Sequence, residues 1–286
     1  TGFGQTGVDA QRPGYDLIIQ GESGIMDITG DPVGLPTKIG TSIADLVTGQ
    51  YASQAIMAAL LQRASTGVGH HVDIAMLDCM ASLLTFNAGI YFTTGESPQR
   101  RGNAHPTIAP YETFRAADGW LNIGVANDKF WQLFCQVIDR TDLAVNPRYA
   151  KAVDRVALRN EVVPIVADEI AAKPRAYWIG RLQAAGVPYG DIRSIKEVCE
   201  AEQLTSRGMV VDMVHPTAGT VQNIDSPFRF DGEKVNDHVP PPMLGQHTSE
   251  VLRQYIGLTE RQLADLNARG VIKSLKTTSY CEEAHG

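Results

Sequence analysis

The sequence lacks a surplus of positive charge. Its 286 residues carry 25 lysines and arginines against 32 aspartates and glutamates, which gives a formal net charge of −7. General affinity for nucleic acid or for an anionic membrane depends on a basic surplus, so this balance disfavours both kinds of partner. A local basic site for a phosphorylated ligand remains compatible with it, because net charge does not fix where the charges lie.

Cysteine is scarce, and long apolar runs are missing. The four cysteines are far apart and form no C-x-x-C pair, so we expect free thiols in a reducing compartment and neither a zinc site nor a disulfide framework. The apolar stretches are interrupted well short of the ~20 residues that cross a bilayer. No signal peptide is recognisable. These absences predict a cytoplasmic protein.

Several catalytic motifs are also absent. The sequence has no H-E-x-x-H, no G-x-S-x-G and no P-loop, which disfavours a zinc protease, a serine hydrolase and a nucleoside triphosphatase. Residues 2–7 do match G-x-G-x-x-G, but no strand precedes them in the sequence, and Pro13 and Gly14 disfavour a helix after them. We therefore interpret them as a glycine-rich loop rather than as a dinucleotide site.

The spacing of apolar residues in the first third predicts alternating helix and strand. Residues 43–63 recur with helical spacing, and the glycines at 67 and 69 end that helix. Residues 71–76 alternate as a strand, and helical spacing resumes from Asp78. This order is typical of an α/β layer.

The rest of the chain has a different pattern of predicted secondary structure. Residues 111–114 and 120–125 predict a hairpin around the turn at 117–119. We expect further helices at 128–139, 154–172, 174–185 and 194–205, β-structure at 208–231, and a helical pair at 248–269. The predicted organisation is a large α/β domain over residues 1–105, a smaller α+β domain over 106–206, and a linker and return segment over 207–286 with a disordered tail.

Two polar positions are candidates for a functional site. Asp78 lies at the predicted junction of strand and helix, where α/β proteins often bind ligands, but an aspartate there is also a common helix N-cap. Asp73, in the predicted strand, competes for any catalytic role. The loop at 100–106, with two arginines and His105, suits a phosphate or a carboxylate and equally suits a solvated turn. Residue spacing alone leaves these alternatives open.

Nine stretches of the sequence together resemble the family III (CaiB/BaiF-type) coenzyme A transferases. They occur in the family's order over about residues 1–272. The stretches are 2–7 (GFGQTG), 12–16 (RPGYD), 23–26 (SGIM), 44–49 (ADLVTG), 66–69 (TGVG), 72–78 (VDIAMLD), 101–106 (RGNAHP), 186–190 (GVPYG) and 241–248 (PPMLGQHT).

The resemblance implies chemistry at particular residues. The aspartate that closes the V-D-x-x-x-x-D stretch is the family's nucleophile, which places a covalent aspartyl intermediate on Asp78. A glycine-bearing loop supplies backbone donors to the developing oxyanion, and its counterpart here is Gly102–His105, comprising Gly102, Asn103, Ala104 and His105. Tyr15 and Asp16 are the further substrate-binding residues that the resemblance suggests. Coenzyme A enters as the thioester substrate, and no separate cofactor or metal is expected.

The resemblance also implies the architecture. It predicts an α/β fold in which an incomplete Rossmann-like large domain contains an inserted smaller α+β domain, and an interlocked homodimer. Full-length family members have a further N-terminal segment. We therefore expect this sequence either to be a fragment or to work with a separate chain that supplies that segment.

Two alternative functions remain at this stage. Acyl-CoA racemases of the same fold carry a histidine where this sequence has Tyr15 and a glutamate near Asn127. A tyrosine with an ordinary pKa near 10 is a poor base at neutral pH, and asparagine is no base, so both differences favour a transferase. The other alternative is a non-catalytic acyl-CoA-binding protein.

Overall fold

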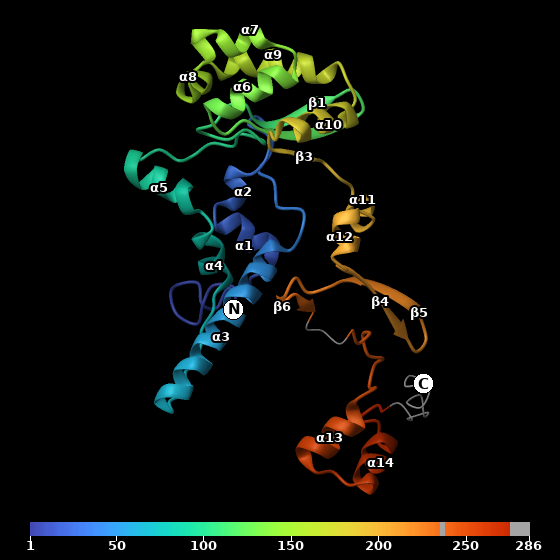
Figure 1. The fold of residues 1–286 in the computed structure, drawn as a ribbon. Helices are drawn as coiled ribbons and strands as arrows, with labels where there is room; N and C mark the ends of the chain where they lie inside the picture. The colour runs from blue at the N-terminus through green and yellow to red at the C-terminus, as the bar shows by residue number, and fades with distance from the viewer. Residues whose placement is uncertain (235–237, 275–286) are drawn as a thin grey trace. The chain divides into compact units, whose positions relative to one another are not determined.

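The structure is a computed structural model that describes residues 1–234 and 238–274. The chain divides into two compact units, with the boundary between Ile192 and Arg193 (Figure 1). The first unit contains α1 (Asp16–Glu22), α2 (Ile25–Ile28), α3 (Ile43–Thr66), α4 (Met76–Ser82), α5 (Thr85–Thr94), β1 (Tyr111–Ala116), β2 (Gly119–Gly124), α6 (Asp128–Val137), α7 (Thr141–Val145), a 3₁₀ turn (Pro147–Tyr149), α8 (Ala152–Ala157), α9 (Arg159–Ala171), α10 (Arg175–Ala185) and β3 (Tyr189–Asp191).

A small apolar core joins the N-terminal segment to α1, α2, α3 and α4. Its buried members are Phe3, Ile19, Ile25, Ala44 and Met80. The long helix α3 was predicted from residue 43, and it ends at Gly67, whose φ of 72° is the left-handed conformation that glycine adopts at helix ends. Along its 24 residues only Ala44 is buried. The apolar face that predicts this helix is therefore half-buried or exposed in the described chain.

The predicted strand at 71–76 is wrong. Residues 71–75 are extended but form no strand, and α4 begins at Met76. The backbone contacts of this stretch go to the start of the chain, since Met76 N–H donates to Thr1 O at 2.9 Å and Leu77 N–H donates to Gly2 O at 3.0 Å. Alternation shows that a segment can be extended, whereas a strand also needs a neighbouring strand that continues the ladder.

The second core of the first unit lies between a sheet and several helices. The sheet has the order β1-β2-β3 and is antiparallel throughout, with Tyr111 opposite Gly124 and Leu121 opposite Asp191. Helices α6, α9 and α10 contact it or one another. Trp131 and Phe134 of α6 lie three residues apart on one helical face and are completely buried. The hairpin and the helices predicted at 128–139 and 174–185 are confirmed. The single helix predicted at 154–172 is wrong in one respect, because the backbone leaves the helical conformation at Leu158 and divides it into α8 and α9.

The second unit contains short elements. These are α11 (Ile195–Cys199), α12 (Glu202–Ser206), β4 (Val210–His215), β5 (Gly219–Ile224), β6 (Arg229–Phe230), β7 (Glu233–Lys234), α13 (Thr248–Ile256) and α14 (Glu260–Ala268). Strands β4 and β5 pair antiparallel, as do β6 and β7. The β-structure predicted for 208–231 and the final helical pair are confirmed. The tail predicted to be disordered lies largely outside the described residues.

The chain is thus a mixture of helices and strands, as the predicted fold class requires. All sheets in the described residues are antiparallel, and the Rossmann-like arrangement of the large domain stays a prediction. The predicted domain boundaries after residues 105 and 206 also stay predictions. Among the described residues, no helix combines the length and the apolar character that crossing a membrane would demand.

Candidate active site

Asp78 lies in the first turn of α4 and its side chain is exposed. The N-cap residue of this helix is Ala75, and no side chain caps the helix. The interpretation of Asp78 as an N-cap is therefore wrong. No described residue donates a hydrogen bond to its carboxylate, which leaves both oxygens open to an incoming ligand.

An open depression of about 470 Å³ surrounds this carboxylate. The hydroxyl groups of Tyr51 and Ser82 lie 2.9 Å apart and connect α3 to α4 at its wall. The competing Asp73 is differently placed, because its Oδ2 accepts a hydrogen bond from the backbone N–H of Gln5 at 3.2 Å. The residues lining the depression are Tyr51, Gln54, Ala55, Ala58, Ile74, Asp78, Cys79 and Ser82.

Tyr15 and Asp16, the other residues singled out near the N-terminus, differ from each other. Tyr15 precedes α1, and 78% of it is exposed. Asp16 is occupied by structural contacts: Oδ1 accepts from the backbone N–H of Ala44 at 2.9 Å, and Oδ2 accepts from Gln20 at 2.8 Å. Asp16 thus ties α1 to the start of α3. Their roles in substrate binding stay predictions.

The predicted glycine-bearing loop is held by backbone contacts at both sides. Gly102 has a φ of 59°, and its N–H donates to Gly30 O at 2.9 Å. His105 N–H donates to Tyr111 O at 3.0 Å, and the two rings meet edge to face with centroids 5.3 Å apart. The His105 Nδ1 accepts from Thr107 N–H at 3.2 Å. His105 is therefore ordered against the start of β1 rather than lying in a solvated turn.

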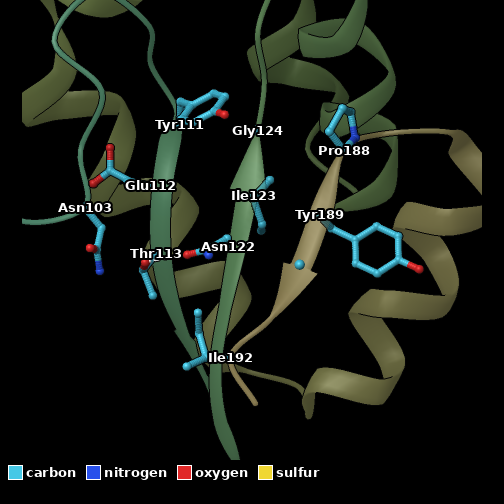
Figure 2. A pocket seen from close by; sticks show the side chains of 11 residues that line it. Asn103, Tyr111, Glu112, Thr113, Asn122, Ile123, Gly124, Pro188, Tyr189 and Ile192 are labelled. Carbon is cyan, nitrogen blue, oxygen red and sulfur yellow. Dashed lines mark hydrogen bonds between the residues drawn. The ribbon is translucent and has the colours of Figure 1, made fainter. Parts of the chain in front are cut away.

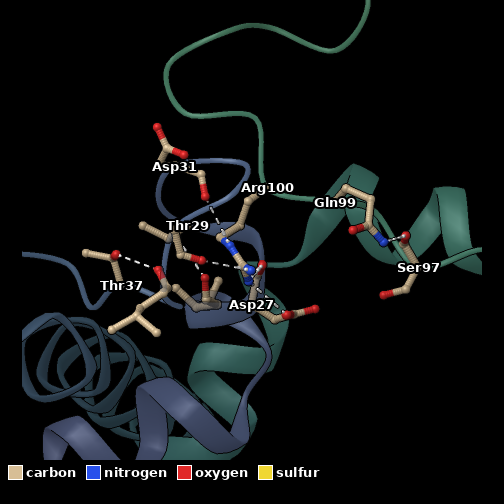
Figure 3. A network of polar contacts seen from close by, with 10 residues as sticks. Asp27, Thr29, Asp31, Thr37, Ser97, Gln99 and Arg100 are labelled. Atoms are coloured by element: carbon tan, nitrogen blue, oxygen red, sulfur yellow. Dashed lines mark hydrogen bonds and ion pairs between the residues drawn. The ribbon is translucent and has the colours of Figure 1, made fainter.

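Arg100 fixes the beginning of the same loop (Figure 3). Its guanidinium donates to the backbone carbonyls of Asp27 at 3.0 Å, Asp31 at 3.3 Å and Gly34 at 3.3 Å, and it forms an ion pair with the Asp27 carboxylate at 3.2 Å. The next arginine, Arg101, is exposed. Of the two arginines that suggested an anion site, one is thus used to join residues 27–34 to the loop.

A cavity of about 470 Å³ lies where this loop meets the sheet (Figure 2). Asn103 borders it from the loop, beside Glu112 and Thr113 of β1, and Tyr189 borders it on the β3 side. No lysine or arginine lines this cavity, so its walls offer neutral polar groups, aromatic rings and one carboxyl. The lining residues are Asn103, Tyr111, Glu112, Thr113, Asn122, Ile123, Gly124, Pro188, Tyr189, Gly190 and Ile192.

Glu112 is a charged residue whose importance the sequence reasoning missed. Its side chain is only 17% exposed and lies 3.3 Å from Arg159, whose side chain is 20% exposed. Burial raises the pKa of Glu112, and the positive charge of Arg159 opposes that rise. The one signal of it in the sequence is an acidic residue inside a strand of the predicted hairpin.

The structure brings some predicted site residues together and leaves others apart. Asn103 and His105 share one loop that reaches the sheet, whereas the depression around Asp78 is lined by α3, α4 and the segment before α4. The depression that contains Asp78 is not lined by the Gly102–His105 loop, and the cavity that Asn103 borders is not lined by Asp78. Within residues 1–234 and 238–274, no group of side chains is suited to hold a metal ion.

Comparisons with known proteins give a consistent result. The human succinyl-CoA:glutarate CoA-transferase is 34% identical over 277 residues, which cover 97% of this chain and 63% of the relative. The succinate–glutarate CoA-transferase of Agrobacterium fabrum is 37% identical over 254 residues, which cover 89% of this chain and 64% of the relative. The chain thus spans less than two thirds of the length of these relatives.

Solved structures agree with the sequence comparison. The crystal structure of a CaiB/BaiF family protein from Brucella suis matches with a TM-score of 0.77 and 38% sequence identity, covering 88% of this chain and 65% of that one. The profile of CoA-transferase family III matches residues 1–248, which is most of the sequence. This match includes Asp78, the loop after it and the whole antiparallel sheet. The chain belongs to CoA-transferase family III.

Proposed function

We propose that the protein moves coenzyme A from an acyl-CoA to a free carboxylic acid, with Asp78 as the covalent nucleophile. The observation that carries this proposal is the environment of Asp78. Its carboxylate is exposed in a depression on the surface, and no described residue donates a hydrogen bond to it. The resemblance of the 72–78 stretch to the family motif supports the same residue as the nucleophile. A carboxylate that accepts no hydrogen bond from the protein and forms no ion pair is available to attack a thioester.

The proposed reaction runs through alternating anhydrides and thioesters. The Asp78 carboxylate attacks the acyl-CoA carbonyl, which forms a mixed anhydride and releases the CoA thiolate. The thiolate attacks the aspartyl carbonyl, which gives an aspartyl-CoA thioester and the free donor acid. The acceptor acid then attacks this thioester, and the thiolate released takes the acceptor acyl group and regenerates the Asp78 carboxylate. Each attack places negative charge on a carbonyl oxygen, which backbone N–H groups stabilise.

The relatives suggest the substrates to test first. Two of them are named for succinyl-CoA or succinate together with glutarate, which are dicarboxylic acids or their thioesters. We therefore propose succinyl-CoA as donor and glutarate as acceptor. No metal or bound cofactor is required, because carboxylate and thiolate supply every nucleophile. The homodimer, a segment or chain supplying the remaining part of the family fold, and a Rossmann-like completion of the large domain belong to the same proposal.

The racemase alternative loses support from the position of Asn127. This residue is the N-cap of α6, and its side-chain oxygen accepts a hydrogen bond from the N–H of Phe130 at 2.9 Å. A side chain committed to capping a helix is not a proton acceptor for a substrate. Entry of solvent deuterium at the α-carbon of an acyl-CoA substrate would revive this alternative.

Intact-mass spectrometry of the protein after mixing with succinyl-CoA tests the proposal. We expect a CoA-sized or acyl-sized adduct in the wild type and none in Asp78→Asn, which keeps the shape of the side chain but not the nucleophile. The matched control is Asp73→Asn, which alters a second exposed aspartate five residues away and should leave the adduct intact. An adduct that persists in Asp78→Asn, or a wild type that forms none with any acyl-CoA, would contradict the proposed chemistry. The latter result would favour a binding protein.

A further inference from the structure

Two arginines on neighbouring helices hold the same short stretch of backbone. Arg155 lies in α8 and Arg159 begins α9, so the two are four residues apart. Arg155 Nε donates to the carbonyl of Ala109 at 3.1 Å. Arg159 Nη2 donates to the carbonyls of His105 at 2.5 Å and Ile108 at 2.8 Å. Three carbonyls within residues 105–109 are therefore bound by guanidinium groups.

Both guanidinium groups are themselves fixed. Arg155 is completely buried, donates to the carbonyl of Tyr149 at 2.9 Å and pairs with Asp128 at 3.2 Å. Arg159 pairs through its other terminal nitrogen with Glu112 on β1. A guanidinium that is bound on both of its sides has little freedom to move. Because the group is planar, its N–H donors then point in fixed directions. The loop carbonyls thus meet donors that are already in place.

The arrangement leaves certain backbone donors of the loop unused. The N–H groups of Ala104, His105 and Thr107 are hydrogen-bonded inside the loop or to β1. Among the described residues, the N–H groups of Asn103 and Ile108 have no acceptor. The two arginines donate hydrogen bonds to carbonyls of this stretch, so these two amide N–H groups stay free. Free backbone N–H groups are the donors that a developing oxyanion requires.

We infer that Arg155 and Arg159 form a clamp that positions the 103–109 segment for catalysis. This inference rests on the proposed function, because the segment contains the loop that would serve the acyl transfer at Asp78. The two arginines are positioning residues: they act through the backbone of the segment and make no contact with the reacting atoms. Glu112 belongs to the clamp as the partner that orients Arg159.

The first arm of the test measures the loop directly and does not depend on activity. Hydrogen exchange followed by mass spectrometry reports the amide of His105, which donates to Tyr111. We expect Arg159→Met to speed this exchange at least about tenfold, since the loss of two hydrogen bonds to the carbonyls of His105 and Ile108 allows the loop to open. The matched control is Arg148→Met, which removes an exposed arginine paired with Glu161 and should leave the exchange unchanged. Unchanged exchange in Arg159→Met would overturn the clamp.

The second arm separates positioning from substrate binding. With the proteins kept well below their melting temperatures, we expect Arg159→Met to lower the rate constant of adduct formation on Asp78 about tenfold, while the acyl-CoA concentration for half-maximal rate changes less than about threefold. Arg159→Lys keeps one charged donor and should restore part of the rate. A loop that exchanges faster while the adduct forms at the wild-type rate would show that the clamp does not serve catalysis.

A second variant keeps the test decisive in case the first variant does not fold. If Arg159→Met does not fold, Glu112→Gln removes the charged partner while nearly preserving shape, and it should produce the same effects at a smaller size, about threefold. Equal rates and equal exchange in Glu112→Gln and the wild type would then overturn the clamp. A wild type that forms no adduct at all would refute the proposed function, and the exchange measurement would still decide the clamp.

Discussion

Replacement of the buried Arg155 by methionine is the most informative test of stability. Methionine is also long and unbranched and replaces the aliphatic part of the arginine side chain, but it cannot donate hydrogen bonds. The change leaves the carbonyls of two buried residues, Ala109 and Tyr149, without their charged donor. It also removes the ion pair with Asp128 and the stacking of the guanidinium over the Trp131 ring, 5.1 Å from its centroid.

The magnitude follows from these contacts. Each of the two buried acceptors that lose their partner costs about 1–3 kcal/mol, and loss of the cation–π contact between two buried groups costs about 2 kcal/mol. Asp128 adds little, because its side chain is 43% exposed and water replaces the lost partner. We expect Arg155→Met to lower the free energy of unfolding by about 4 kcal/mol, the lower end of this sum. For a unit of this size, that corresponds to a fall in melting temperature of about 8–16 °C.

Tryptophan fluorescence in urea is the appropriate assay. Of the three tryptophans of the chain, Trp131 in α6 and Trp178 in α10 are buried in the core that Arg155 supports, so their emission reports that core. The control, Arg148→Met, removes a pair in which both side chains are about half exposed and should stay within about 0.5 kcal/mol of the wild type. A loss below about 1 kcal/mol in Arg155→Met would refute the reasoning that these carbonyls depend on it.

Further predictions concern backbone packing and the cysteines. A Cβ at Gly14 would lie 2.8 Å from the Cα of Gly2, so Gly14→Ala should push the N-terminal segment away at a cost of about 1–3 kcal/mol and speed amide exchange in α1; unaltered exchange would contradict this packing. Iodoacetamide at pH 8 should label the partly exposed Cys199 of the native protein well before the buried Cys79 and Cys135, as peptide mapping would reveal. Burial raises the pKa of Cys135 to about 12, so the folded protein keeps a proton that the unfolded chain releases near pH 9. The free energy of unfolding should therefore fall between pH 9 and 12, and Cys135→Ala should show a shallower fall in the same urea assay.

Much of the fold was predictable because its signals are local. The apolar recurrence of α3, the hairpin turn before Gly119 and the helical face of α6 each arise within a few residues of sequence. The capping of α6 by Asn127 is equally local. Such elements are specified by neighbouring side chains and backbone preferences, and these do not depend on distant parts of the chain.

The candidate site was predictable only in part. The family resemblance singled out Asp78, but sequence spacing alone left the choice between a nucleophile, a helix cap and Asp73 open. The tertiary structure excludes the helix-cap role for Asp78, since Ala75 is the N-cap residue of α4. It also shows that the Asp73 carboxylate accepts a hydrogen bond from the backbone N–H of Gln5. The strand expected at 71–76 failed for a related reason: alternation predicts an extended segment, and the partners of that segment were decided elsewhere in the chain.

The sequence by itself thus determined the order and type of most elements, and it determined the family through motifs whose order is visible along the chain. Only the tertiary structure decided which charged side chains hold distant parts of the fold together. Arg155 and Arg159 reach carbonyls 46 to 54 residues away, and Glu112 faces Arg159 across 47 residues. The physical reason is that burial and hydrogen bonding at a charged group depend on whatever packs around it, and that surrounding is assembled from segments that are remote in the sequence.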